Sequence, residues 1–149
     1  MVRNSNKMNK KIDHVDLKIL EILEENSREP FTRIAKILNM SEAAIRKRVN
    51  KLEKLGIIKK YTIEIDYFKI GFKVCIIGID VLPEYLTSIL NKLRRIKEIK
   101  QIYLSSGDHD IMVKVIYSSS EKLERIVENI KKMEGVSKVC PAILIEKIL

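Results

Sequence analysis

The spacing of apolar residues changes near residue 60, and this change divides the chain into two kinds of structure. Before it, apolar side chains recur every three or four residues, as they do along one face of an α-helix. After it, Tyr61, Ile63 and Ile65 alternate with polar residues, a pattern typical of a strand. The 149 residues are therefore predicted to form an α+β protein with a helical first part and a mixed second part.

The first part is predicted to hold three short helices. The first helix extends from about Asp13 to Asn26, and Pro30 follows at a point where it should have ended. The second begins near Thr32, a plausible N-cap. It ends before Asn39, because asparagine tolerates the left-handed backbone conformation that a sharp turn requires.

The third helix begins at Glu42, directly after Ser41, which is a good N-cap. It runs to about Leu55 and stops at Gly56, a residue type that often follows a helix. One side of this helix is apolar, and the other is basic with two small alanines near the N-terminus. These features predict a helix-turn-helix (winged-helix-like) domain with its motif at about residues 31–50.

The basic helix predicts contact with double-stranded DNA, because an α-helix fits the major groove of B-DNA. Ala43 and Ala44 would let the backbone approach the bases, and Arg46, Lys47 and Asn50 could read base edges. A three-helix bundle with a solvated charged surface is the alternative. The remaining residues expected to bind DNA are Thr32 and Ser41, with phosphate contacts expected from Arg28, Arg33, Arg48, Lys51 and Lys54.

Positive charge is concentrated in the first sixty residues. Residues 1–60 contain 15 Lys+Arg and 8 Asp+Glu, whereas residues 61–149 contain 14 and 12, within a net charge of +9. This asymmetry favours a polyanionic partner for the first part, although a solvated basic surface would have the same composition. Residues 1–11 are basic and lack the apolar segment of a secretory signal, so we expect a disordered arm there.

Two further features bear on where the protein works. The sequence contains no run of 18 apolar residues, so we expect no membrane span. Cys75 and Cys140 lie far apart and form no C-x-x-C pair, which favours reduced thiols and a cytoplasmic protein.

The first part also carries a set of residues at fixed spacings. They are Asp13-x-x-Asp16-x-x-Ile19-Leu20, Ile34-Ala35, Leu38, Ser41, Arg48, Leu52 and Gly56-x-Ile58. In this pattern the chain resembles the Lrp/AsnC family of transcription regulators. The family usually has glycine where Asn39 stands, and the tolerance of asparagine for the left-handed conformation makes that departure benign. The resemblance implies a DNA-binding domain at residues 12–60 and a hinge strand within the linker at residues 61–72.

The second part reads as strand, helix, strand, strand, helix, strand, the order of a ferredoxin-like fold. Pro83 suits the first turn of one helix, and residues 118–120 are serines that could cap the other. Pro141 argues that the last strand lies at an edge or carries a bulge. The four antiparallel strands are expected at residues 73–82, 99–105, 111–117 and 136–145.

The predicted strands are apolar on both faces, and Lys114 is the only charged residue at positions 111–117. Two helices cover only one face of a sheet, so we expect a homodimer in which the uncovered faces pack together. The resemblance implies the same arrangement. The second domain of the family, the RAM domain, here residues 73–149, dimerises through its sheets, often assembles to tetramers or octamers, and binds effectors.

The stretch LSSGDHD at residues 104–110 places a histidine between two acids. A metal site is disfavoured, because in an extended segment Asp108 and Asp110 point one way and His109 the other. No nucleophile and base that indicate catalysis lie nearby, and a plain hairpin turn, with glycine at positive φ, remains an alternative. We favour a site for a small zwitterion, and the resembled family binds amino-acid effectors at this loop. The expected effector-binding residues are Leu104, Ser105, Ser106, Gly107, Asp108, His109 and Asp110.

Together these features predict a sequence-specific DNA-binding regulator whose assembly or DNA binding responds to a small effector, most simply an amino acid. We expect no enzymatic activity, no cofactor and no metal. Two alternatives remain. One is an enzyme on the same scaffold, similar to certain haem-biosynthesis decarboxylases, which would not need a basic third helix. The other is a nucleoid protein that binds DNA with little sequence preference.

Overall fold

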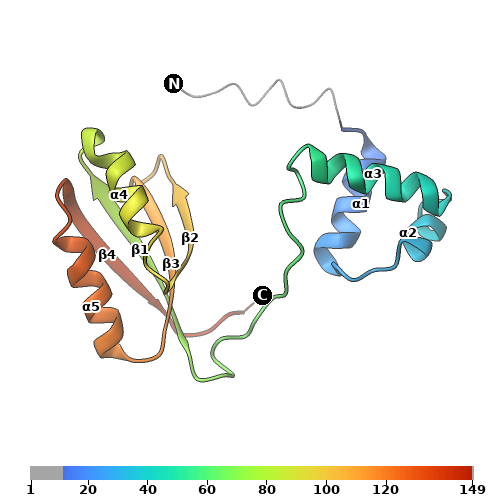
Figure 1. Cartoon of the computed structure of the whole chain (residues 1–149). Helices are drawn as coiled ribbons and strands as arrows, with labels where there is room; N and C mark the ends of the chain where they lie inside the picture. The colour runs from blue at the N-terminus through green and yellow to red at the C-terminus, as the bar shows by residue number, and fades with distance from the viewer. Residues whose placement is uncertain (1–11, 149) are drawn as a thin grey trace. The chain divides into compact units, whose positions relative to one another are not determined.

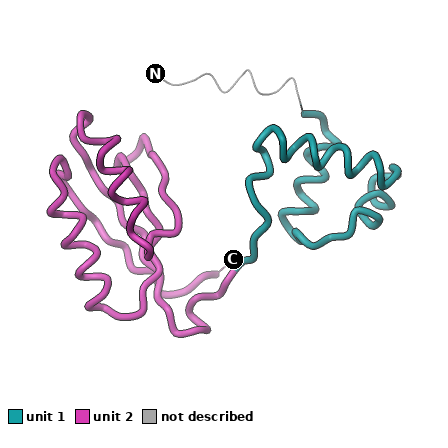
Figure 2. Tube along the Cα trace, in the orientation of Figure 1, with its two compact units in different colours: residues 1–64 teal, residues 65–149 magenta. Residues whose placement is uncertain are grey.

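The computed structural model describes residues 12–148, and the chain divides into two compact units, residues 1–64 and 65–149 (Figure 2). Each unit has its own hydrophobic core. The predicted disordered arm at residues 1–11 lies outside the described residues.

Three helices build the first unit: α1 (His14–Glu25), α2 (Phe31–Ile37) and α3 (Glu42–Lys54) (Figure 1). Their order and lengths confirm the predicted helix-turn-helix. Each helix turns an apolar stripe inward, and the stripes meet in one core. The fully buried side chains of this core include Ile19, Ile34, Ile45 and Leu52.

The turns and caps of this unit agree with the sequence at three positions and differ at one. Asn39 has a φ of 51° and Gly56 a φ of 67°, so both adopt the left-handed conformation. Ser41 caps α3 by accepting a hydrogen bond from the backbone N–H of Ala44 at 3.2 Å. The prediction of Thr32 as an N-cap is wrong: α2 begins at Phe31, so Pro30 is the N-cap, without a side-chain hydrogen bond, and Thr32 lies in the first turn.

The predicted hinge strand is not formed. Residues 59–66 have no regular secondary structure, and residues 67–71 form turns. Apolar side chains do alternate along this segment, with Ile63 exposed by 73% and Ile65 by 40%. A strand also needs a neighbour for its backbone hydrogen bonds, and no strand of the described chain pairs with this one. Residues 12–64 contain no strand, so the helix-turn-helix lacks the β-hairpin, or wing, of a winged helix.

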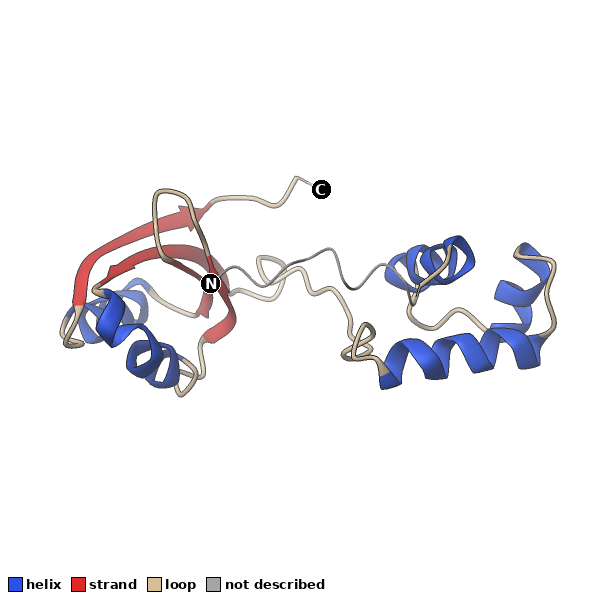
Figure 3. Ribbon diagram, turned by 90° about the horizontal axis from the view of Figure 1, so that it is seen from above, coloured by secondary structure: helices blue, strands red, loops and turns tan. Residues whose placement is uncertain are grey.

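The second unit has the predicted ferredoxin-like topology. Its four strands form one antiparallel sheet in the order β2-β3-β1-β4, and α4 and α5 cover the same face of it (Figure 3). A short 3-10 turn, η2, leads into α4. The elements are β1 (Lys73–Val81), η2 (Pro83–Tyr85), α4 (Leu86–Leu93), β2 (Ile99–Leu104), β3 (Ile111–Tyr117), α5 (Ser120–Lys131) and β4 (Val136–Leu144).

The two faces of the sheet differ in what they bury. Alternate residues of β1 and β3, among them Ile77 and Val113, are fully buried against the helices. Ile76 and Met112, which lie between them, point to the opposite face and are half-buried. β4 is an edge strand that pairs only with β1, which confirms the expectation drawn from Pro141. We call the face away from the helices the open face.

Candidate nucleic-acid interface and ligand loop

A shallow groove of about 840 Å³ runs along the outer face of α3. It lies on the side of the helix opposite the buried stripe of Ile45, Val49 and Leu52. The groove therefore brings together most of the residues that the sequence assigned to base contact. Its lining is Glu42, Ala43, Arg46, Lys47, Asn50, Lys51, Lys54 and Leu55.

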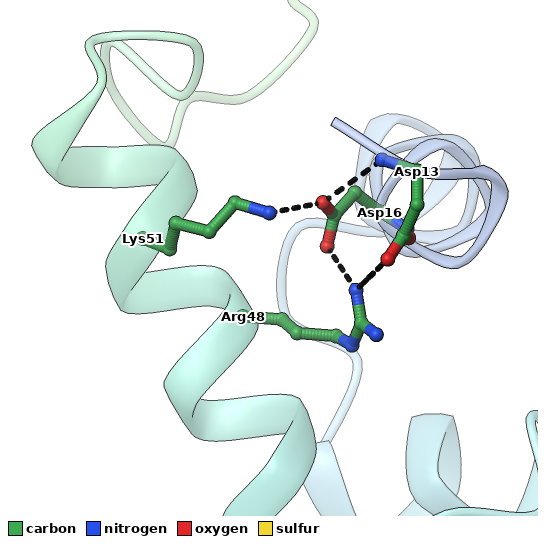
Figure 4. Close-up of polar contacts among 4 residues, drawn as sticks. All are labelled: Asp13, Asp16, Arg48 and Lys51. Carbon is green, nitrogen blue, oxygen red and sulfur yellow. Dashed lines mark hydrogen bonds and ion pairs between the residues drawn. The ribbon is translucent and has the colours of Figure 1, made fainter. Parts of the chain in front are cut away.

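Two cations predicted to contact phosphates, Arg48 and Lys51, form ion pairs with the start of α1 (Figure 4). Arg48 Nη1 donates to Asp13 Oδ2 and to Asp16 Oδ1, each at 2.7 Å. Lys51 Nζ donates to Asp16 Oδ2 at 2.5 Å. Asp16 is completely buried, so its charge requires these partners. The cluster of these four residues, the α1–α3 ion-pair cluster, joins the first helix to the third.

The ion-pair cluster also caps α1. The Asp13 side chain accepts a hydrogen bond from the Asp16 N–H at 2.9 Å, and the Asp16 side chain accepts one from the Asp13 N–H at 3.3 Å. This reciprocal arrangement is a capping box. The hydrogen bond from Arg48, with that from the Asp16 backbone, lowers the pKa of Asp13 to about 2.

Asp16 shows opposing effects on its pKa. Burial raises the pKa, because it penalises the charged form, but hydrogen bonds from Lys51 and Arg48 outweigh burial and the pKa lies below its ordinary value. The same contacts raise the pKa of Arg48, first through Asp13 and then through Asp16. Both carboxylates and the Arg48 guanidinium are therefore charged at neutral pH.

The other predicted DNA-facing residues differ in how freely they can reach a partner. Within the described chain, Lys47, Asn50 and Lys54 make no side-chain hydrogen bond or ion pair. Arg46 pairs with Glu42 at 2.7 Å and lies 5.2 Å from the centre of the Phe31 ring. The other predicted residues make local contacts. Arg33 pairs with Glu29, and the Arg28 N–H donates to the Asn26 side chain. Thr32 lies within α2, and Ser41 caps α3 by accepting from the Ala44 N–H.

The predicted effector loop, residues 104–110, joins β2 to β3 and is pinned to the end of β1. Asp110 Oδ2 accepts a hydrogen bond from the backbone N–H of Val81 at 2.9 Å. His109 Nδ1 lies 2.8 Å from Asp80 Oδ1. The His109 ring packs against Gly78, where an added Cβ would lie 2.0 Å from a ring carbon. Only glycine leaves room for the ring at this position.

The rest of the loop remains open to solvent. Leu104, Ser105, Ser106, Gly107 and Asp108 are all exposed. The Gly107 N–H donates to Ser105 Oγ at 3.2 Å. The φ of Gly107 is not positive, so the turn does not require the positive φ that was expected of this glycine. In residues 12–148, no group of three or more His, Cys, Asp or Glu side chains is arranged to hold a metal ion.

Two family models match the chain, and together they span most of it. The AsnC-type helix-turn-helix domain matches residues 12–53, and the Lrp/AsnC ligand-binding domain matches residues 74–148. The chain belongs to the Lrp/AsnC family. It is therefore a transcriptional regulator with a DNA-binding and a ligand-binding domain, and its curated relatives are regulators, not enzymes.

Individual members of the Lrp/AsnC family align over almost the full chain. HTH-type transcriptional regulator LrpA of Pyrococcus abyssi is 48% identical over 92% of this chain and 99% of the relative. HTH-type transcriptional regulator LysM of Saccharolobus solfataricus is 41% identical over 86% and 89%. Among solved structures, E. coli AsnC superposes with a TM-score of 0.78 at 28% identity, covering 93% of this chain and 95% of that one.

Several structural residues of this Lrp/AsnC chain were not identified as such from sequence. Asp13 and Asp16 belong to the shared family pattern, as does Arg48, and their joint presence was a signal that they interact. Gly78 and Asp80, which seat His109, carried no such signal, because nothing in the sequence of β1 indicates that a distant loop folds over it. Among the described residues, no helix is long and apolar enough to cross a membrane.

Proposed function

We propose that the regulator recognises a specific DNA sequence through the outer face of α3. The observation that carries this proposal is that Lys47 and Asn50 line the α3 groove without a side-chain partner in the described chain, beside the small Ala43. Side chains that are free and project from one helix face can enter the major groove, where each base pair presents a distinct pattern of donors and acceptors. Asn50 would read a base edge, and Ala43 would allow close approach.

Salt dependence and selected sequences test this proposal together. DNA selected from a random pool should yield a defined motif, and log affinity should fall linearly with log salt concentration. Asn50→Ala should relax the preference at one base position, at a cost of about 1–3 kcal/mol for the preferred base. Lys18→Ala, an exposed change on α1, is the control. A pool that yields no motif would favour a nucleoid protein with little sequence preference.

We further propose that a small amino acid binds at residues 104–110. Three features support this: the match of this unit to a ligand-binding domain, the exposed Asp108 carboxylate, and the firm seat of the loop on β1. An exposed carboxylate can hold the ammonium group of an amino acid. Asp110 already accepts the Val81 N–H, so we assign it to positioning the loop, and Asp108 is the sharper test.

The effector proposal is tested by measuring DNA affinity with and without each of the twenty amino acids. Asp108→Asn should abolish the response to the active amino acid and leave affinity in its absence unchanged. Glu124→Gln, which removes the same charge from the exposed surface of α5, should keep the response. An undiminished response in Asp108→Asn would return the loop to a simple hairpin turn.

The working form that we propose is a dimer joined through the open faces of two sheets, with tetramers or octamers built from it, in the cytoplasm. The open face is the support: it carries half-buried apolar side chains such as Ile76 and Met112 on the side that no helix of the unit covers. A dimer would also present two α3 helices, which suits operators with two half-sites.

A further inference from the structure

A second basic groove lies in the ligand-binding unit. It has a volume of about 430 Å³ and is lined by the C-terminal ends of α4 and α5. Three of its residues are cations, and none is a carboxylate. The lining consists of Lys92, Arg95, Ile96, Asn129, Lys132 and Met133. We call this surface the α4–α5 groove.

The three cations of the groove are exposed, and none has an ion pair or side-chain hydrogen bond within residues 12–148. Neighbouring cations on the same helix layer are paired: Lys122 lies 2.9 Å from Glu98, and Lys131 lies 3.0 Å from Glu128. Positive charge is thus neutralised beside the groove and left free in it.

The surrounding sequence has the same bias. Residues 91–97, NKLRRIK, contain four cations and no acid, whereas the rest of residues 61–149 contains 10 Lys+Arg and 12 Asp+Glu. Lys92 lies in the last turn of α4, where a cation complements the helix dipole. Arg95 lies beyond the end of α4, so the dipole does not account for it.

We propose that the α4–α5 groove binds the phosphate backbone of DNA, as a contact additional to α3. This inference rests on the proposed DNA-binding function. The helix layer lies on the opposite side of the sheet from the open face, so the groove would stay accessible in a dimer joined through that face (Figure 3).

The form of the groove favours a polyanion over a small free anion. A small anion is held by converging donors, such as the backbone N–H groups at the start of a helix. The groove lies at helix C-termini, which present carbonyl oxygens. What it offers is three flexible, exposed cations, and such cations act additively on a chain of phosphates by releasing its counterions.

The test uses a duplex that contains the selected operator and extends beyond it on both sides. The variant Lys92→Gln/Arg95→Gln/Lys132→Gln is compared with the matched control Lys122→Gln/Arg125→Gln/Lys131→Gln, which removes equal charge from cations already bonded within the unit. Affinity is measured by fluorescence anisotropy over a range of salt concentrations. The plot of log affinity against log salt concentration should become less steep by about two to three for the groove variant, because each phosphate contact adds roughly 0.9 to the magnitude of its slope. The slope should change little for the control.

A groove variant whose salt slope equals that of the wild type would overturn the inference. The same unchanged slope is expected if the groove binds an acidic peptide and not DNA. Arg95→Gln alone, expected to lower the slope by about one, covers the case in which the triple variant does not fold. Failure of the wild-type chain to bind DNA would contradict the proposed function. An unchanged salt slope in the groove variant of a chain that does bind DNA would contradict only the role of the groove.

Discussion

At the scale of single residues, the α1–α3 ion-pair cluster gives a physical reason for three positions of the family pattern. Asp13, Asp16 and Arg48 meet in this cluster, where the buried Asp16 carboxylate is held by Arg48 and Lys51 and forms a reciprocal cap with Asp13. Arg48 and Lys51 thus hold α3 against α1, whereas Lys47, Asn50 and Lys54 make no side-chain hydrogen bond or ion pair within the described chain.

Replacing Asp16 by Asn should therefore destabilise the first unit. The buried amide would leave Arg48 and Lys51 without their shared carboxylate, and the loss of these charge-assisted hydrogen bonds should cost about 1.5–3 kcal/mol. Glu42→Gln, which breaks the exposed pair with Arg46, should cost no more than about 0.5 kcal/mol. Urea denaturation followed by circular dichroism measures both. Equal costs for the two variants would contradict the role given to Asp16.

Asn39 allows a matched pair of substitutions at one backbone conformation. Its φ of 51° is unfavourable for residues with a Cβ, so Asn39→Ala should lower the free energy of unfolding by about 1 kcal/mol. Asn39→Gly should be neutral within a few tenths of a kcal/mol, because glycine adopts this conformation without steric strain. A thermal melt of each variant tests the expectation, and an Ala variant as stable as the Gly variant would refute it.

At the scale of elements, local signals predicted the helices and the strand order, whereas contacts between distant segments were not predictable. Ser41, Gly56 and Pro141 act on the backbone within their own segment of the chain, so their effects can be read from sequence. The bond of Arg48 to Asp13 spans 35 residues and depends on the angle between two helices. The seating of His109 on Gly78 likewise depends on how a loop returns over a strand, and periodicity carries no information about that.

The contact between α1 and α3 should also weaken in acid. The pKa of Asp13 is lowered from 3.8 to about 2, and that of Asp16 is lowered as well. Folded-state pKa values below those of the unfolded chain mean stabilisation that is present above about pH 4 and is lost as the pH falls through the folded values. Unfolding free energies between pH 5 and pH 2 should therefore fall.

The contribution of the cluster is separated from that of other carboxylates by comparison with Asp16→Asn. Glu98 and Glu121 in the second unit also have lowered pKa values, so both proteins should lose stability in acid. The loss should be smaller in the variant, which no longer has the Asp16 carboxylate to protonate. Parallel curves for the two proteins would show that the cluster does not contribute to the acid response.

At the scale of the whole molecule, the open face of the sheet is the feature that a single chain leaves unexplained. Cys75 and Ile77 of β1 are completely buried by the helices, while Ile76 between them points the other way and is half-buried. Across the sheet, Ile76 is paired with Lys114 on β3 and with Ala142 on β4. Such a face favours a second copy, because burying its apolar area removes that area from water.

Ile76→Lys should therefore convert the assembly to monomers. It places a second cation beside Lys114 at the centre of the proposed interface, where an unpaired charge would have to be desolvated. Thr87→Lys adds the same charge to the exposed surface of α4 and should leave the assembly intact. Size-exclusion chromatography with light scattering gives the masses.

A monomeric variant should also lose affinity for operators with two half-sites and retain more of its affinity for a single half-site, because only a dimer binds both half-sites at once. An Ile76→Lys protein with the mass of the wild type would place the contact between copies on another surface.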